Sequence, residues 1–415
     1  MCPRHRTARR ITKCPECPLC SCPALCLAGL QLPSPLEDFR AMDIDPASPS
    51  PRTSTRDRAE LRARLEAWLR NQYAGARITD FSAPTANGMS SETLLFTAIW
   101  TDEGIEGRHR CVARLPPAAD AVPIFPVYDF EKQSRVMRIA RERTQLPVPR
   151  VLWYESDAAH LGAPFIVMER MDGEAPPDVP PYVFDSWLLR AGPELQAQLQ
   201  SHAIGVIADL HRVALAEDEI AYLRASQGEG SALRRHVEAQ REFYAWVCSD
   251  GIRLPVIERG FEWLEAHWPD NEHDEVLSWG DARIGNLLFT DFRPSAVLDW
   301  EMAATGPREM DLGWMIYLHH FFQDFTPLVG LPGIPGMMGL DSAAATYASA
   351  SGHKPRNLEI YAFYAALRHG ILMSRTARRG ILFGEATMPA DPDDLVMHRA
   401  SLEAMMAGTY WASRR

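Results

Sequence analysis

Apolar residues recur at helical spacing in the first part of the chain that has the pattern of a folded segment. Within residues 57–73, four of them fall on one helix face: Leu61, Leu65, Trp68 and Leu69. This spacing predicts an amphipathic helix. Two strand-like runs follow at 92–100 and 110–115, and the turn-prone Asp-Glu-Gly sequence between them predicts a β-hairpin.

A second helix is predicted over 130–143, and the runs at 147–154 and 164–169 have the composition of strands. Beyond the Pro-rich segment 176–181 the pattern is mainly helical, with predicted helices at 193–213, 231–249, 256–267 and 358–379. This change near 170–175 marks a boundary between two lobes. We therefore predict an α+β protein, with an antiparallel sheet and a packed helix in the first lobe and mainly helices in the larger second lobe.

The N-terminal region differs in composition from the rest. Six of the eight cysteines lie close to the start of the chain, and Pro and Ser are frequent after them. A Cys-x-x-Cys spacing there could bind Zn²⁺, but no matching second pair follows, and the apolar run that could form a secretory signal is interrupted. We interpret 1–56 as a disordered extension and linker, or as a translated upstream region whose true start is Met42. The N-terminal lobe is then expected at 57–172 and the C-terminal lobe at 173–415.

Composition narrows the possible functions. With 415 residues, 46% hydrophobic and 23% charged, the chain can bury large cores in two lobes. A formal net charge of −11 argues against nucleic-acid binding, and no apolar run reaches the ~18 residues needed to span a bilayer. Two cysteines in the body, Cys111 and Cys248, are typical of a reduced, cytoplasmic protein. Because lysine is rare and arginine common, any role that needs a fixed cation falls mainly to arginine here.

Two short motifs carry the candidate chemistry. Asp281 and Asn286 lie five residues apart on a Gly-flanked loop in Leu-Ser-Trp-Gly-Asp-Ala-Arg-Ile-Gly-Asn-Leu-Leu-Phe, and Asp299 follows a short apolar run in Ala-Val-Leu-Asp-Trp-Glu. Phosphoryl transfer needs a carboxylate near the attacking oxygen and oxygen ligands for Mg²⁺ on the nucleotide phosphates. The alternative is that the first pair only makes turn hydrogen bonds and that Asp299 only ends a strand.

These motifs, together with Gly-Pro-Arg-Glu-Met-Asp-Leu-Gly-Trp at 306–314, resemble the aminoglycoside phosphotransferase family, which has a protein-kinase-like fold. The resemblance covers roughly residues 60–410. Its motif sequences are most similar to those of the phosphotransferase domains fused to acyl-CoA dehydrogenases and less similar to those of resistance enzymes. It implies that Asp281 orients the hydroxyl and accepts its proton late, and that Asn286 and Asp299 bind Mg²⁺. Arg283 would face the transferred phosphate, with a surface salt bridge as the other interpretation.

In the first lobe the resemblance implies a nucleotide site. The loop at 86–93 would cover the phosphates through its backbone and through Asn87, Gly88, Ser90 and Ser91, although an ordinary hairpin turn has the same sequence features. Arg114 occupies the position of the family's strand lysine. Its partner on the following helix would be Glu131, with Gln133 as the alternative, and Glu131 could also be a solvated carboxylate. The backbone from Glu169 to Met171 would pair with adenine.

Two further positions concern the catalytic loop. Trp279 stands where the family usually has His, and an indole could replace that side chain by packing and donating one hydrogen bond. Asp311 matches a family Asp that ties the loop to the helical lobe, which is a structural role.

The resemblance implies an ATP- and Mg²⁺-dependent small-molecule kinase that phosphorylates a hydroxyl group. Many aromatic and Met residues in the second lobe favour an acceptor with apolar parts, such as a hydroxyacyl-CoA thioester, over a polycationic aminoglycoside-like compound. The alternative is a nucleotide-binding pseudokinase or scaffold without turnover, which Trp279, Arg114 and Gln133 favour. Retention of the two aspartates and the asparagine argues against it. No membrane or nucleic-acid partner is expected.

Overall fold

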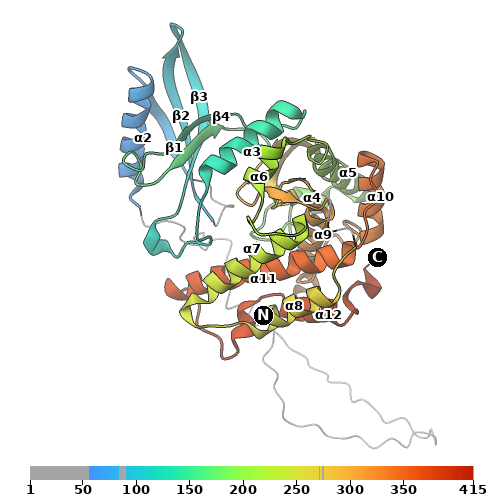
Figure 1. The fold of residues 1–415 in the computed structure, drawn as a ribbon. Helices are drawn as coiled ribbons and strands as arrows, with labels where there is room; N and C mark the ends of the chain where they lie inside the picture. Colours follow the sequence, from blue (N-terminus) through green and yellow to red (C-terminus); the bar gives the residue numbers. More distant parts are fainter. Residues whose placement is uncertain (1–55, 84–89, 271, 273–274, 415) are drawn as a thin grey trace, which may run out of the picture.

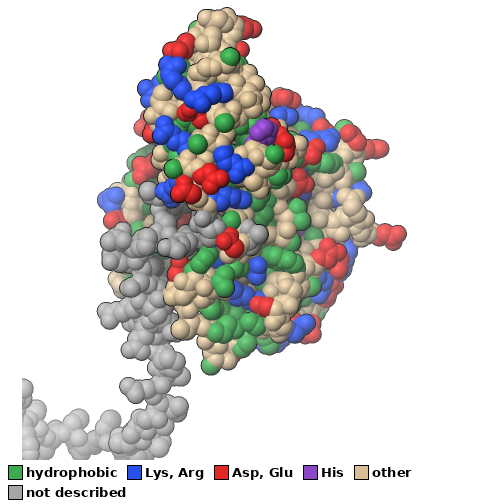
Figure 2. Space-filling view, turned by 90° about the vertical axis from the view of Figure 1, so that its left-hand side faces the viewer, with side chains coloured by type: hydrophobic (Ala, Val, Ile, Leu, Met, Phe, Trp, Pro, Cys, Tyr) green, Lys and Arg blue, Asp and Glu red, His purple; other side chains and the backbone are tan. Residues whose placement is uncertain are grey.

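The structure is a computed structural model that describes residues 56–83, 90–270, 272 and 275–414. The predicted N-terminal extension and the phosphate-loop residues Asn87 and Gly88 lie outside these residues. A narrow N-terminal lobe stands on a broader, mainly helical C-terminal lobe (Figure 1). Basic and acidic side chains are interspersed over the face seen in Figure 2.

A five-stranded antiparallel sheet forms the N-terminal lobe, with strand order β1-β2-β3-β5-β4. Its strands are β1 (Arg77–Ser82), β2 (Glu92–Asp102), β3 (Ile105–Leu115), β4 (Val151–Glu155) and β5 (Phe165–Glu169). The helix α2 (Arg58–Gln72) begins at the N-cap Asp57, whose side chain accepts from the Glu60 N–H. The helix α3 (Phe130–Arg143) is capped in the same way by Asp129.

The two helices cover opposite faces of this sheet. Residues of α2 share a buried cluster with Ala113 and Val167, whereas α3 packs with Ile166 and Met168. Because successive side chains of a strand point to opposite faces, Arg114 lies on the face opposite Ala113. The sheet therefore directs Arg114 away from α2 and towards the second lobe.

The C-terminal lobe is built from helices around two short two-stranded sheets. The helices are α4 (Trp187–Arg190), α5 (Pro193–Leu210), α6 (Glu217–Leu223), α7 (Ala232–Val247), α8 (Pro255–Ala266), α9 (Glu309–Gln323), α10 (Leu340–Ser351), α11 (Leu358–Leu382) and α12 (Arg399–Met406). The small sheets pair β6 (Val276–Ser278) with β9 (Ala304–Gly306), and β7 (Leu287–Thr290) with β8 (Arg293–Val297). None of the described helices is long and apolar enough to cross a membrane.

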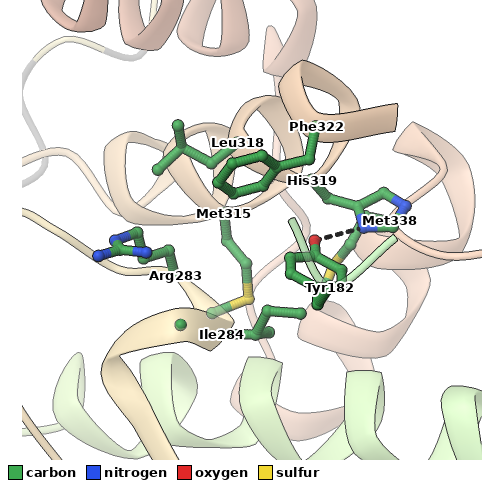
Figure 3. Close-up of a pocket in the computed structure, with 9 residues that line it drawn as sticks. Tyr182, Arg283, Ile284, Met315, Leu318, His319, Phe322 and Met338 are labelled. Atoms are coloured by element: carbon green, nitrogen blue, oxygen red, sulfur yellow. Dashed lines mark hydrogen bonds between the residues drawn. The ribbon is translucent and has the colours of Figure 1, made fainter. Parts of the chain in front are cut away.

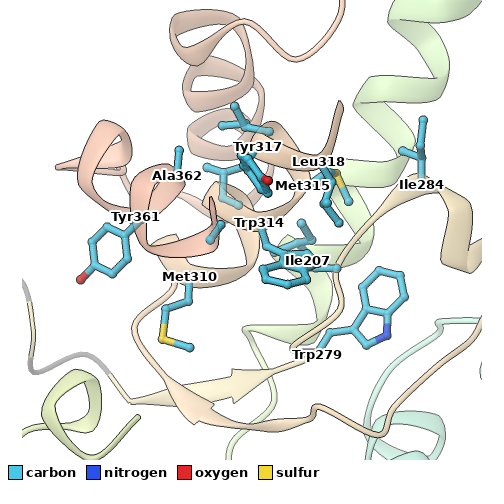
Figure 4. Packing of buried hydrophobic residues seen from close by; sticks show 14 of the residues in the cluster. Ile207, Trp279, Ile284, Met310, Trp314, Met315, Tyr317, Leu318, Tyr361 and Ala362 are labelled. Atoms are coloured by element: carbon cyan, nitrogen blue, oxygen red, sulfur yellow. The ribbon is translucent and has the colours of Figure 1, made fainter. Parts of the chain in front are cut away.

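The helix α9 is the centre of this lobe, and it packs directly against α11. A Cβ added to Gly313 would lie 2.7 Å from the Tyr361 carbonyl carbon, so only glycine allows this approach of the two backbones. Trp314, Met315, Tyr317 and Leu318 belong to the same buried cluster as Trp279 of the catalytic loop (Figure 4). The large core of the second lobe thus supports the loop that carries the candidate site.

The predicted α+β, bilobal fold is confirmed, as are the first helix and the 130–143 helix. Sequence reasoning missed β1, whose residues are mostly polar or exposed because it is an edge strand. It also missed α9, because every residue from Glu309 to Phe321 is buried and the helix has no polar face to produce a periodic signal.

Candidate active site

Asp281 lies on the loop that connects β6 to β7. Its Oδ2 accepts a hydrogen bond from Nδ2 of Asn286 at 2.7 Å, and the same amide donates to the Asp281 carbonyl at 3.1 Å. Its Oδ1 accepts from the indole Nε1 of Trp314 at 2.7 Å. Gly280 before it has φ of +86°, and a Cβ there would meet the Met302 carbonyl oxygen at 2.1 Å. The loop therefore brings Asp281 and Asn286 together in a geometry that requires glycine.

The surroundings of Asp281 favour its neutral form. Burial raises the pKa of this carboxyl, and the nearby charge of Asp299 adds to the increase. Arg283 and the hydrogen bonds from Trp314 and Asn286 act in the opposite direction without cancelling the shift. A carboxyl whose pKa is moved towards neutrality in this way is suited to accepting a proton.

Asp299 follows β8 and faces Arg114 across the junction of the lobes. Arg114 Nη1 lies 3.0 Å from Asp299 Oδ1, and Nη2 lies 3.2 Å from Glu301 Oε2. Asp299 has φ of +59°, which is rare for a residue other than glycine and marks a strained position. Ser91 also contacts Arg114, because its hydroxyl oxygen accepts from Nε at 3.0 Å and from Nη2 at 2.6 Å.

The forked side chain of Arg114 therefore joins three groups at once. A lysine at this position carries a single ammonium group and could not reproduce that planar arrangement. Burial disfavours the charge of Arg114, but Asp299 and Glu301 raise its pKa above the ordinary value.

Glu301 is a component of the site that sequence reasoning missed. Burial and the charge of Asp299 raise its pKa to about 8, and Arg114 only partly opposes this. The residue stood inside the Leu-Asp-Trp-Glu motif, two positions after Asp299. Its place in that motif was the signal that could have identified it.

The predicted helix partner of Arg114 is wrong. Glu131 is exposed on α3, and the ion pairs of Arg114 are made with Asp299 and Glu301 instead. The alternative, Gln133, is buried, and its Oε1 has no hydrogen-bond partner. The physical reason is that the carboxylates of the second lobe lie within reach of the arginine, while Glu131 gains more from hydration than from burial.

Arg283 is held by a carboxylate from a distant segment. Its Nη1 donates to both oxygens of Asp178, at 2.8 and 2.7 Å, and its Nε lies 3.4 Å from Asp281 Oδ2. Burial works against its charge, but the two carboxylates raise its pKa. A Cβ on Gly285 would lie 2.4 Å from Nη1, so glycine makes room for this pair. The Pro-rich segment that contains Asp178 offered no signal for this contact.

Asp311 fastens the catalytic loop to α9. Its carboxylate accepts from the backbone N–H groups of Trp279 and Gly280 and from the Ser278 hydroxyl, at 2.8 to 3.0 Å. His211 Nε2 lies 3.1 Å from the same group. These contacts agree with the predicted structural role.

Trp279 supports the next turn of the site. Its indole Nε1 donates to the carbonyl oxygen of Leu298 at 2.8 Å and to that of Asp299 at 3.2 Å. The side chain is fully buried. The indole therefore packs and donates as expected, and it holds the strained Asp299 backbone.

At the edge of the first lobe, the Ser90 carbonyl accepts from the Tyr128 hydroxyl at 2.7 Å. The backbone from Glu169 to Met171 was predicted to pair with adenine. One of its hydrogen-bonding groups is already used, because the Glu169 N–H donates to the Arg150 carbonyl at 2.9 Å. Met171 lies two residues further on and is partly buried. Of this segment, the backbone at Met171 is therefore the better placed to pair with adenine.

A small apolar pocket adjoins Arg283 on the side of the helical lobe (Figure 3). Met315, Leu318 and Phe322 of α9 line one wall, and Ile284 of the catalytic loop lines another. Tyr182 closes it, with its hydroxyl 2.8 Å from Nδ1 of His319. This wall next to the catalytic loop is thus largely without charge.

The site offers few protein side chains as ligands for a metal ion. In the described parts of the chain, no group of three or more His, Cys, Asp and Glu side chains is arranged to hold a metal ion. Mg²⁺ commonly uses one or two carboxylates together with substrate phosphates and water. Asp299 and Asn286 supply oxygen donors of this kind. Burial and the repulsion from Asp299 raise the pKa of Glu301, and a divalent cation would relieve that repulsion. These residues fit the predicted ion.

Comparison with known proteins agrees with this geometry. Residues 96–352, more than half of the chain, match the model of the phosphotransferase enzyme family. The chain is 32% identical over 196 residues to acyl-CoA dehydrogenase family member 11 of Gallus gallus, which covers 46% of this chain and 23% of that protein. The chain thus corresponds to less than a third of that relative's length.

Among solved structures, a candidate aminoglycoside phosphotransferase of Ralstonia eutropha JMP134 superposes with a TM-score of 0.56 and 22% identity, covering 84% of this chain and 97% of that one. An ethanolamine kinase of Plasmodium vivax superposes with a TM-score of 0.53 and 14% identity, covering 82% and 85%. Both show that the fold is kinase-like.

Proposed function

Because the chain belongs to the phosphotransferase enzyme family, we propose that it transfers the γ-phosphate of ATP to a hydroxyl group of a small molecule and requires Mg²⁺. The observation that carries the proposal is the arrangement of Asp281. Its two carboxylate oxygens accept hydrogen bonds from Asn286 and Trp314, and it lies in the same charged cluster as Asp299.

Asp281 orients the acceptor hydroxyl and receives its proton late in the reaction. An alcohol is too weak an acid to lose its proton to a carboxylate beforehand. A carboxylate has about four acceptor sites, so the bonds from Trp314 and Asn286 leave room for one from the substrate. The same bonds fix the carboxylate, which reduces the cost of positioning it.

Asp299 and Asn286 would hold Mg²⁺, with Glu301 close by, and the ion would offset the charge of the nucleotide phosphates. Arg114 belongs to the nucleotide side of the site, where its guanidinium can face phosphate oxygens. Ser90 and Ser91 lie beside it at the end of the phosphate-covering loop.

Arg283 would stabilise charge on the transferred group. The two-oxygen contact with Asp178 fixes its Nη1, while Nη2 makes no hydrogen bond within the described part of the chain. A fixed cation beside the base costs no reorganisation during the reaction.

For the acceptor we propose a hydroxyl compound with an apolar part, of which a hydroxyacyl thioester is the first candidate. Two observations support it: the mainly apolar lining of the small pocket that Arg283 also borders, and the similarity to a protein named as an acyl-CoA dehydrogenase family member. A polycationic acceptor would need several unpaired carboxylates, but Asp178 and Asp281 already face Arg283.

The test is Mg²⁺-dependent release of ADP from ATP by the purified protein over a panel of hydroxyacyl-CoA thioesters, choline-like alcohols and aminoglycosides. We expect acceptor-stimulated release that Asp281→Asn abolishes. Asp209→Asn is the matched control, because it makes the same change at an exposed carboxylate of α5. Binding of ATP without ADP release for every acceptor would contradict the proposal and favour a scaffold.

A further inference from the structure

His369 is the feature of the helical lobe that the mechanism has not used. It lies near the middle of α11 and is partly exposed, although Arg368 and Gly370 on either side are buried. Its ring contacts aromatic rings of α9, with centroids 4.6 Å from Phe321, 5.6 Å from Tyr317 and 6.2 Å from Trp314. The imidazole is therefore held firmly between two helices.

Only one of its ring nitrogens is engaged. Nδ1 lies 2.9 Å from the Tyr317 hydroxyl. Nε2 has no hydrogen-bond partner in the described part of the chain. Unlike Nδ1 of the neighbouring His398, which also lacks a partner, it is not fully buried. Nε2 is therefore not fully enclosed by the core.

His369 is linked to the candidate active site through Trp314. Trp314, which touches the His369 ring, donates its indole N–H to Asp281. The charge of Arg283 also acts on His369: burial first, then His398 and Arg283, lower the pKa of this imidazole. His369 thus stands one aromatic ring away from the proposed base.

The tautomer follows from the partner on Nδ1. The Tyr317 hydroxyl makes no other hydrogen bond within the described residues, and a phenol O–H is a stronger donor than an imidazole N–H. With the Tyr317 proton directed to Nδ1, the neutral ring carries its own proton on Nε2. The exposed nitrogen is then a donor.

We infer, on the basis of the proposed function, that His369 binds the acceptor by donating a hydrogen bond from Nε2 to a carbonyl oxygen near the reacting hydroxyl. The acceptor class is a hydroxyl compound that also carries a carbonyl group, as a thioester, ester or amide does. Tyr317 is a positioning residue that holds the donor tautomer. A neutral N–H donor on which the charge of Arg283 also acts disfavours an ammonium group at this position.

The test compares two acceptors that differ in one group: a hydroxyacyl-CoA thioester and its thioether analogue, in which CH₂ replaces the carbonyl. For wild type we expect a higher kcat/KM with the thioester. His369→Leu should lower that value about tenfold, the usual effect of one hydrogen bond, and leave the thioether value and the KM for ATP unchanged. His369→Gln, which retains an N–H donor, should restore most of the loss, and Tyr317→Phe should show a smaller loss of the same kind.

Equal losses with both acceptors would indicate a structural role for His369 and overturn the inference, as would no loss with either. A wild-type protein that phosphorylates only acceptors without a carbonyl group would also overturn it while leaving the proposed kinase function intact. Absence of ADP release for every acceptor would overturn both.

Discussion

Asp281 and Asp311 are two buried carboxylates of the same loop region with opposite electrostatics. Asp281 accepts hydrogen bonds from two neutral side chains and a longer one from Arg283, lies near another carboxylate, and has a raised pKa. Asp311 has more hydrogen-bond donors around it. Burial alone would raise its pKa. Hydrogen bonds from His211, Gly280 and Ser278 nevertheless move that pKa below the ordinary value.

The difference shows how the loop separates chemistry from support. A carboxylate with several donors is stabilised as an anion and has little tendency to accept a proton. A buried carboxylate with fewer donors and an acidic neighbour retains that tendency, which is what a proton acceptor needs. Substitutions at these two positions and at the indoles beside them should therefore have different effects on turnover and on folding.

The largest expected effect is that of Asp281→Asn on turnover. Loss of the proton acceptor should reduce kcat by about 10²- to 10⁴-fold. The free energy of unfolding should change by less than about 1 kcal/mol, because a poorly stabilised charge is removed together with its hydrogen bonds. ADP release measures turnover and thermal unfolding measures stability. A large loss of stability would contradict the difference in role between Asp281 and Asp311.

Asp311→Asn should have the larger effect on folding. The substitution leaves a backbone N–H or His211 without its anionic partner in the core, which should cost about 3 kcal/mol of unfolding free energy. Denaturant unfolding at neutral pH measures this cost. Asp394→Asn is a matched control, because that carboxylate is exposed and pairs with Arg399 at the surface.

The effect of Asp311 on stability should depend on pH in a defined direction. Because its pKa is lower in the folded state than in the unfolded chain, its contribution is complete above the unfolded value of about 3.9. The contribution declines as pH falls below that value. The stability difference between wild type and Asp311→Asn should therefore narrow in acid; a difference that widened there would show that the anion is not what the site stabilises.

Trp314→Phe should have an intermediate effect. It keeps an aromatic ring against Arg368 and His369 but removes the N–H that Asp281 accepts. We expect kcat to fall about tenfold. The acid limb of the pH–rate profile should move to higher pH, because that hydrogen bond lowers the pKa of Asp281. Trp411→Phe is the control, because the buried N–H of that indole has no hydrogen-bond partner among the described residues, and it should leave the profile unchanged.

The smallest effect is expected at Trp279. Trp279→Phe removes the donor to the carbonyl groups of Leu298 and Asp299, which should cost about 1 kcal/mol of stability and lower kcat a few-fold through the position of Asp299. Trp279→His keeps a ring N–H, so it should retain more activity than the Phe variant. Kinetic assays and thermal unfolding of both variants check this; equal losses would mean that packing alone matters.

The sequence determined the parts of this protein that depend on neighbours along the chain. Alternation along β3 predicted that Arg114 lies on one face of its strand, and the five-residue separation of Asp281 and Asn286 placed their side chains in contact. The strand runs, the first two helices and the change to a mainly helical second lobe follow from the same local patterns. The family match of residues 96–352 confirmed the predicted class of enzyme, a phosphotransferase.

The tertiary structure decided which distant residues complete the site. Asp178 pairs with Arg283 across 105 positions, and Glu301 reaches Arg114 across 187. Trp314 and His369 come from helices whose own patterns indicate only burial. Glu131 was misassigned for the same reason: local spacing cannot tell which carboxylate will be nearest when two lobes meet. Contacts of this kind are set by packing between distant elements, because the free energy of a buried charge depends on every group around it and not on its neighbours in sequence.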